Sequence, residues 1–198
     1  MTQAQTLNHT LIDRIWPDGR ISKGLRSIIL AVIGSALLWL SAKIQVPFWP
    51  VPMTMQTFVV LTLGMAYGWR LGAATVMLYL VEGAAGLPVF AGTPEKGIGL
   101  AYMLGGTGGY LVGFVLAAAV CGYLAERGWD RRVVTTALAM LIGNALIYIP
   151  GLVWLGSLFG WDKPIVEWGL TPFILGDLVK LALAAAILPL VWKTLRRH

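Results

Sequence analysis

The sequence predicts an all-α integral membrane protein with six transmembrane helices and both termini in the cytoplasm. Of its 198 residues, 58% are apolar and only 12% are charged, whereas soluble domains have roughly half and a quarter. The apolar residues gather into six runs that approach or reach the length of a bilayer span. The basic residues stand in short clusters between these runs, which is typical of membrane proteins. We therefore attribute the net charge of +6 to membrane topology and predict no binding of nucleic acid.

Residues 1–26 precede the first apolar run and are predicted to form a cytoplasmic segment. Apolar residues recur there at helical spacing and stop before a proline, namely Leu7, Leu11, Ile12, Ile15 and Trp16. This spacing predicts an amphipathic helix on the membrane surface, with a short disordered tail as the alternative. A secretory signal would end in a small-residue cleavage site soon after the first run. The sequence that follows the run is "LSAKIQVPFWP", so we expect no cleavage.

The six apolar runs are predicted to form one transmembrane domain over residues 27–192, followed by a basic cytoplasmic tail at 193–198. A membrane-spanning helix needs about 20 apolar residues, with about 17 as the usual lower limit. The runs lie at approximately 27–44, 53–67, 71–87, 105–125, 133–155 and 172–192. The second run is short, so we expect its helix to be tilted, extended by its flanks or partly buried in protein. Trp69 and Arg70 follow it almost at once, which predicts a tight turn.

The basic residues predict the orientation of these spans. With a cytoplasmic N-terminus, the inner segments hold eleven Lys and Arg residues: Arg14, Arg20, Lys23, Arg26, Arg70, Arg127, Arg131, Arg132, Lys193, Arg196 and Arg197. The outer segments hold three, namely Lys43, Lys96 and Lys163. This asymmetry follows the positive-inside rule. The outer segments are long and rich in proline, glycine and aromatic residues, so we expect them to enclose something on that face.

Small residues on the fourth run predict a close helix contact. They recur every four residues, at Gly105, Gly109, Gly113, Ala117, Cys121 and Ala125, and small side chains let membrane helices approach one another. Ala31 and Ser35 give the first run a shorter face of this kind. That face can serve an internal contact, which we favour, or a partner subunit. The "GGTGG" at 105–109 lacks the lysine and hydroxyl of a phosphate-binding loop, so we predict no nucleotide site.

Polar residues within the spans are the candidates for function, because charges inside a bilayer are costly. Asp177 and Lys180 are three residues apart on one predicted helix and therefore share a face. They stand about 5 and 8 residues below its outer end, roughly 7 to 12 Å deep, within reach from outside. They form either a structural ion pair or a site for a solute with N–H donors and oxygen acceptors.

Other polar residues in the spans have simpler explanations. Glu82 is best explained as a helix-end carboxylate at the membrane interface, and Asn144 as an interhelical hydrogen-bonding group rather than a ligand contact. Tyr79 and Tyr148 belong either to the core or to a pocket. The single cysteine excludes an intrachain disulfide, and no metal-ligand spacing is present. Both histidines lie outside the six runs, so no hydrolase triad can be placed there and we predict no catalytic residues.

Three stretches resemble the BioY family: "LPVFAG" at 87–92, "TGGY" at 107–110 and "GDLVK" at 176–180, within a collinear match from about Val46 to Pro189. BioY proteins are the biotin-specific substrate-capture (S) subunits of energy-coupling factor (ECF) vitamin transporters. The resemblance implies an S-component fold in a bacterial inner membrane that binds biotin from the outer side, with no cofactor or metal. It also implies that a separate transmembrane coupling subunit and two ATPase subunits drive uptake. Trp39 follows Ala31 and Ser35 where a docking face would have another small residue.

The resemblance further implies which residues meet the ligand. In the family, the last helix supplies an acid and a lysine, and Asp177 and Lys180 stand at these positions. Asp177 would accept from the ureido N–H groups of biotin, and Lys180 would donate to an oxygen at one end of the ligand. We expect aromatic residues to cover the ring and the stretch "VPFWPVPMTMQT" at 46–57 to form a stiff apolar lid. The candidate ligand-binding residues are Asp177, Lys180, Asn144, Tyr79, Trp49, Phe48 and Phe90.

Three alternatives to biotin capture remain open on the sequence alone. The chain could capture another vitamin, which competition experiments would decide. It could be a membrane-embedded enzyme with Asp177 as its base, which product formation would show. It could also be a structural assembly protein that binds no small ligand.

Overall fold

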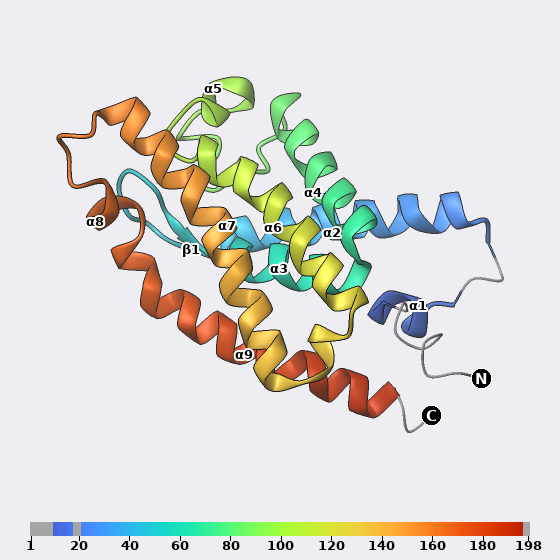
Figure 1. Ribbon diagram of the computed structural model, residues 1–198. Coiled ribbons are helices and arrows are strands. Elements are labelled where there is room, and N and C mark those ends of the chain that lie inside the picture. Colours follow the sequence, from blue (N-terminus) through green and yellow to red (C-terminus); the bar gives the residue numbers. More distant parts are fainter. Residues whose placement is uncertain (1–9, 18–20, 196–198) are drawn as a thin grey trace.

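The computed structural model describes residues 10–17 and 21–195, and they form a bundle of helices (Figure 1). A helix lies at each of the six predicted runs: α2 (Lys23–Lys43), α3 (Gln56–Tyr67), α4 (Trp69–Ala84), α6 (Gly108–Glu126), α7 (Val133–Phe159) and α9 (Ile174–Leu195). Four of these regions, those of α2, α6, α7 and α9, are long and apolar enough to cross a membrane. The other two helices, α3 and α4, have 12 and 16 residues. The short second run thus becomes a short helix, as predicted.

Short elements connect the six helices. They are α1 (Leu11–Ile15), α5 (Gly99–Met103), α8 (Ile165–Gly169) and the 3-10 helices η2 (Trp129–Arg131) and η3 (Thr171–Phe173). The strands β1 (Gln45–Val46) and β2 (Met53–Thr54) pair antiparallel, with Gln45 opposite Thr54 and Val46 opposite Met53. The sequence predicts an all-helical chain, and among the described residues this pair of short strands is the difference from that prediction.

Two connections lie at one end of the bundle. The first loop comprises residues 44–55 between α2 and α3, and the second loop comprises residues 85–98 between α4 and α5. The same end also holds α8, whereas the described ends of the chain lie together at the opposite end (Figure 1). This arrangement agrees with the predicted topology, in which both termini share one side of the membrane.

The turn between α3 and α4 is as tight as predicted. Gly68 is the one residue between the two helices, and its φ of 80° lies in the region that favours glycine. A methyl group at this position would also lie 2.5 Å from Oε1 of Glu126. The same oxygen accepts a hydrogen bond from the backbone N–H of Trp69 at 3.2 Å. A capped turn of this kind lets the chain reverse direction within one residue.

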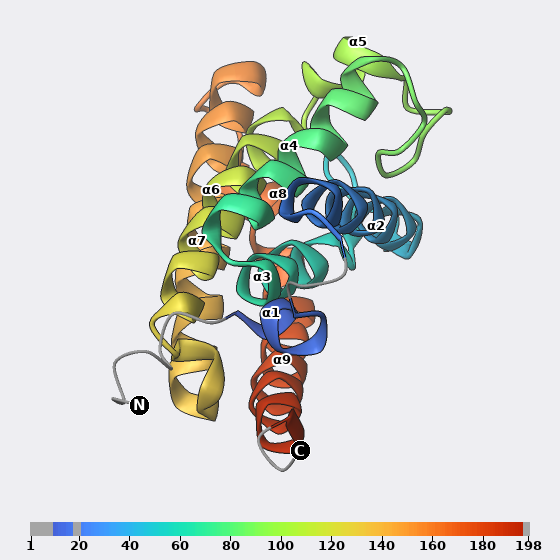
Figure 2. The same ribbon diagram turned by 90° about the vertical axis from the view of Figure 1, so that its right-hand side faces the viewer.

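Helix α6 occupies the centre of the bundle, between α4 and α7 (Figures 1 and 2). Its small residues allow this position, because a methyl group on Gly113 would lie 2.7 Å from Cα of Ile147 on α7. One turn earlier, a methyl group on Gly109 would lie 2.3 Å from the carbonyl oxygen of Pro150. The predicted contact stripe is therefore confirmed along α6. Gly105 precedes the helix and does not belong to the stripe.

The first apolar helix makes the internal contact that we favoured. Ser35 on α2 is buried and its hydroxyl donates a hydrogen bond to the carboxylate of Glu82 on α4. Glu82 lies in the last turn of α4, as expected of a helix-end carboxylate, and has this serine as its partner. Trp39 lies on the exposed side of α2. One face of α2 thus packs inside the protein and the other faces outward.

The described part of the N-terminal segment packs against α3 and α9 (Figure 2). Leu11 of α1 is buried, and Nη2 of Arg26 donates to the carbonyl oxygen of Ile12 at 3.0 Å and to Oδ1 of Asp13 at 3.1 Å. Partial burial raises the pKa of Asp13, but hydrogen bonds from Thr10 and Arg26 lower it further than burial raises it. Leu7, Arg20 and residues 196–198 of the basic tail lie outside the described residues. A location of this segment on the membrane surface stays a prediction.

Candidate functional site

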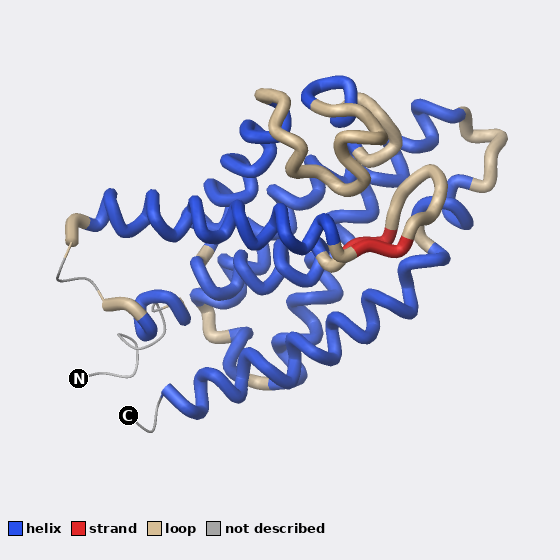
Figure 3. The backbone as a smooth tube through the Cα atoms, turned by 180° about the vertical axis from the view of Figure 1, so that it is seen from behind, coloured by secondary structure: helices blue, strands red, loops and turns tan. Residues whose placement is uncertain are grey.

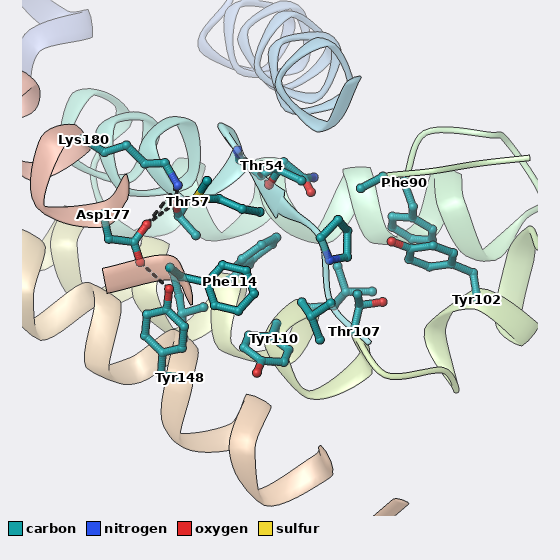
Figure 4. A pocket seen from close by; sticks show the side chains of 18 residues that line it. Thr54, Thr57, Phe90, Tyr102, Thr107, Tyr110, Phe114, Tyr148, Asp177 and Lys180 are labelled. Carbon is teal, nitrogen blue, oxygen red and sulfur yellow. Dashed lines mark hydrogen bonds and ion pairs between the residues drawn. The ribbon is translucent and has the colours of Figure 1, made fainter. Parts of the chain in front are cut away.

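A cavity lies at the end of the bundle that holds the two loops. Its wall comes from the first and second loops and from α3, α5, α6, α7, η3 and α9. Figure 4 shows charged and hydroxyl groups at one end of this cavity and an aromatic pair at the other. Segments far apart in the sequence thus build one elongated site.

The charged end of the cavity is a cluster of four side chains (Figure 4). Nζ of Lys180 lies 2.9 Å from Oδ1 of Asp177 and donates to Oγ1 of Thr57, also at 2.9 Å. The Thr57 hydroxyl donates to the same Asp177 oxygen at 3.2 Å. The hydroxyl of Tyr148 donates to Oδ2 of Asp177. Both carboxylate oxygens therefore have partners, as a buried charge requires.

The pair predicted on one face of the last helix is indeed formed. Asp177 and Lys180 are 6% and 7% exposed, and both line the cavity. A buried ion pair contributes little net stability, because removing two charges from water costs about as much as their attraction gains. The hydroxyls of Thr57 and Tyr148 offset part of that cost. This cluster can both accept and donate hydrogen bonds toward a solute in the cavity.

A second chain of polar groups lies behind the cavity wall. Gln56 lines the cavity, and its Nε2 donates to the hydroxyl of Tyr79 at 2.7 Å. The Tyr79 hydroxyl donates in turn to the backbone oxygen of Val89 at 2.9 Å. Tyr79 is fully buried and lies behind the lining rather than in it. It therefore connects α3 to the second loop and supports the wall from behind.

Phe90 lies at the aromatic end of the cavity. Its ring stacks on Tyr102 at a centroid distance of 4.8 Å and meets the edge of Tyr79 at 5.4 Å. The absence of a side chain at Gly83 makes room for it, because a methyl group there would lie 2.0 Å from Cζ of Phe90. Phe90 is only 1% exposed and lines the cavity. It is therefore a wall residue that is fixed on several sides.

Three other candidates lie outside the cavity lining. Phe48 contacts the lining residue Phe173 edge to face, with ring centroids 6.1 Å apart. Trp49 is 69% exposed and its ring packs against aromatic residues near α8. Asn144 lies on α7 one turn from Tyr148, and its buried Oδ1 has no hydrogen-bond partner among the described residues. The first loop instead lines the cavity with Val51, Pro52, Met53 and Thr54.

Sequence reasoning missed several polar residues of the site, among them Gln56 and Thr57. These two are the last residues of the stretch at 46–57 and lie within the second apolar run, and in the structure they begin α3. They stand near the outer end of a span, as Asp177 and Lys180 do, so their depth in the membrane was the signal that could have identified them. Neither carries a charge, so the cost of burial did not draw attention to them.

The volume of the cavity is about 50 Å³. Pockets that hold small molecules usually have roughly 300–1,000 Å³. A solute of that size exceeds this volume, so we expect part of the wall to move outward when one binds.

Comparison with known proteins identifies the family. The BioY family model matches residues 8–197. The chain is 37% identical to the probable biotin transporter BioY of Pyrococcus horikoshii, covering 82% of this chain and 93% of that protein. It is 38% identical to the biotin transporter BioY of Thermotoga maritima, over 82% of this chain and 94% of that protein. The chain therefore belongs to the BioY family.

A solved structure shares the fold. The S-component for biotin from an ECF-type ABC transporter superposes with a TM-score of 0.69 at 22% identity, covering 88% of this chain and 95% of that one. The S-component fold predicted from the sequence is thus confirmed, and the chain is a multi-pass membrane protein.

Proposed function

We propose that this member of the BioY family captures biotin from the outer side of the membrane, as the substrate-specific subunit of an ECF-type transporter. The observation that carries the proposal is the cluster of Asp177, Lys180, Thr57 and Tyr148 in the wall of a cavity near the outer loops. A polar cluster that only joined α3, α7 and α9 would have no need of a cavity beside it. The names of the relatives supply the identity of the ligand.

The chemistry of the cavity suits the chemistry of biotin. Biotin has a ureido group with two N–H donors and one carbonyl acceptor, an apolar thioether ring and a tail that ends in a carboxylate. Asp177 accepts from the ureido N–H groups and Lys180 donates to a ligand oxygen. Thr57 and Tyr148 hold the two charged groups in place while the ligand binds. Phe90 and Tyr102 give the apolar parts of the ligand an aromatic surface at the far end.

Access to the site requires one wall to move, because the cavity is smaller than the ligand. The first loop is the proposed moving part, acting as a lid. Its prolines restrict the conformations of the open state, so that closing over the ligand costs less entropy.

Partner subunits are proposed to supply the energy for transport. The solved S-component comes from an ECF-type ABC transporter, and the described residues here include no phosphate-binding loop. A separate transmembrane coupling subunit and two ATPase subunits would complete the transporter in a bacterial inner membrane. Uptake into cells with and without these subunits tests this part.

Equilibrium binding of labelled biotin to the purified protein tests the site. We expect Asp177→Asn and Lys180→Met each to weaken binding about 10- to 100-fold, because a hydrogen bond to a charged group contributes about 1.5–3 kcal/mol. Asp162→Asn is the matched control, since Asp162 is an exposed carboxylate of the outer side. Absence of binding by the wild type would refute the proposed function. Wild-type affinity in both variants would refute the site.

A further inference from the structure

Helix α2 ends where the first loop begins (Figure 3), and its last residue, Lys43, is surrounded by acceptors from the second loop. Its Nζ lies 2.9 Å from the carbonyl oxygen of Pro88, 3.2 Å from that of Phe90 and 3.2 Å from that of Thr93. The side-chain oxygen of Thr93 accepts as a fourth partner at 3.1 Å. An ammonium group has three N–H donors, so these four acceptors saturate it.

These contacts distinguish Lys43 from the other two lysines of the outer segments. Lys163 pairs with its neighbour Asp162 at 2.9 Å. Lys96 is exposed and its stem lies along Gly92 within the second loop. Lys43 alone of the three joins a helix to a distant loop, 45 to 50 residues further along the chain.

The segment that Lys43 holds, residues 88–93, brings Phe90 and Ala91 into the cavity wall. It is fixed from the buried side by the hydrogen bond from Tyr79 to the carbonyl oxygen of Val89. Lys43 fixes it from the exposed side, and hydrogen bonds from a charged donor are about twice as strong as neutral ones. The segment is therefore held on both sides, at adjacent residues.

The position of Lys43 in the chain adds a second role. The first loop begins at the next residue, and its base is closed by a hydrogen bond from the N–H of Met55 to the carbonyl oxygen of Ile44 at 3.1 Å. The same lysine therefore links the base of the first loop to the second loop. An outward movement of the first loop would leave this link in place, because it lies at the hinge rather than at the tip.

We propose that Lys43 is a positioning residue of the biotin site. It holds residues 88–93 so that Phe90 stays in the wall, and it thereby provides a stationary surface against which the ligand is enclosed. Lys43 does not line the cavity and touches no ligand itself. The inference rests on the proposed function for its ligand, but the holding of the loop can be measured without any ligand.

Two measurements on the purified full-length protein test this role, with Lys43→Met, Lys43→Arg and the control Lys96→Met. Hydrogen–deuterium exchange of residues 86–97 is measured without ligand, and the dissociation rate of labelled biotin is measured separately. The amides of Thr93, Lys96 and Gly97 are hydrogen-bonded within the loop and report its order. We expect Lys43→Met to raise the exchange rate and the dissociation rate about tenfold. Lys43→Arg should return both rates most of the way to the wild-type values, because it keeps a charged donor. Lys96→Met should match the wild type in both.

The outcomes separate this inference from the proposed function. Wild-type exchange and dissociation rates in Lys43→Met would overturn it, as would an equal effect of Lys96→Met. A failure of Lys43→Arg to restore either rate would also overturn it, since the proposed role depends on a charged donor. If the wild type binds no biotin, the proposed function is wrong. The hydrogen–deuterium exchange measurement, which needs no ligand, then decides whether Lys43 holds the second loop. A thermal unfolding midpoint close to that of the wild type confirms that Lys43→Met remains folded.

Discussion

The two loops that wall the cavity are held in different ways. The second loop inserts Phe90, which is 1% exposed, between Tyr79 and Tyr102, and its backbone is tied to Tyr79 and Lys43. The first loop has a strand pair of two residues on each side and buries Val51, but its aromatic residues Phe48 and Trp49 are 38% and 69% exposed. Regions with few buried contacts open at lower free energy than well-packed ones. We infer that the second loop is the stationary wall and the first loop the moving one.

On the proposed function, this difference would let a small cavity serve a larger ligand. A wall that moves as a whole would have to break the packing around Phe90, whereas the first loop can swing from its base at residues 44 and 55. The polar cluster on α3, α7 and α9 then stays in place while the opening changes. The difference between the two loops can therefore be tested by comparing substitutions in one loop with matched substitutions elsewhere in the chain.

The largest effect is expected from Phe90→Ala. Removal of a fully buried aromatic side chain costs about 3–5 kcal/mol of unfolding free energy. Phe48→Ala is the counterpart in the first loop, where the side chain is 38% exposed, and should cost less than half as much. Denaturant or thermal unfolding in detergent micelles measures both. Equal losses in the two variants would remove the distinction between a packed loop and a loose one.

A smaller effect is expected from Tyr79→Phe. The variant keeps the ring but leaves the Val89 carbonyl oxygen and the Gln56 amide without their partner. A buried polar group without a partner costs about 1–3 kcal/mol. Tyr123→Phe is the control, because Tyr123 is an exposed tyrosine on α6. The unfolding free energy and the affinity for biotin should both fall in Tyr79→Phe alone, and an unchanged affinity would mean that the second loop keeps its place without this bond.

The contrast between Phe90 and Trp49 also shows where sequence reasoning ends. Both are aromatic residues beside or near prolines in outer segments, and both were candidates for covering the ligand. Phe90 reaches the cavity because Gly83, on another element, leaves space for its ring. Trp49 turns away because Phe159 and Trp168, more than a hundred residues later, provide its partners. Such directions depend on tertiary contacts that no local pattern contains.

The helices and the charged pair were predictable for the opposite reason. Run length and hydropathy determine where a chain can cross a bilayer, and they placed even the short α3 correctly. The cost of charge in a membrane marked Asp177 and Lys180, and helical spacing put them on one face. Thr57 lies 120 residues before Asp177 and is uncharged, so neither charge nor helical spacing could join it to the pair.

The smallest effect on folding is expected from Trp49→Ala. This variant is also the most direct test of whether the first loop moves. An exposed aromatic contributes little to folding, and its edge-to-face contacts with Phe159 and Trp168, at 5.7 and 5.2 Å, are worth about 0.5–1.5 kcal/mol each. If those contacts form only when the first loop is closed, their loss favours opening. The dissociation rate of labelled biotin should then rise roughly 5- to 10-fold, a change of about 1–1.4 kcal/mol. The unfolding free energy should fall by about 1 kcal/mol, the lower end of what the two contacts contribute, because the Trp49 ring is exposed.

Trp161→Ala is the control for this variant, because Trp161 is an equally exposed tryptophan of the outer side, at 68% against 69% for Trp49. Its removal should leave the dissociation rate unchanged, since it makes no ring contact with the first loop among the described residues. A dissociation rate that is unchanged in Trp49→Ala would show that the tip of the first loop does not hold the cavity closed. A large loss of stability in the same variant would show that the first loop is part of the packed core, and the contrast between the two walls would no longer stand.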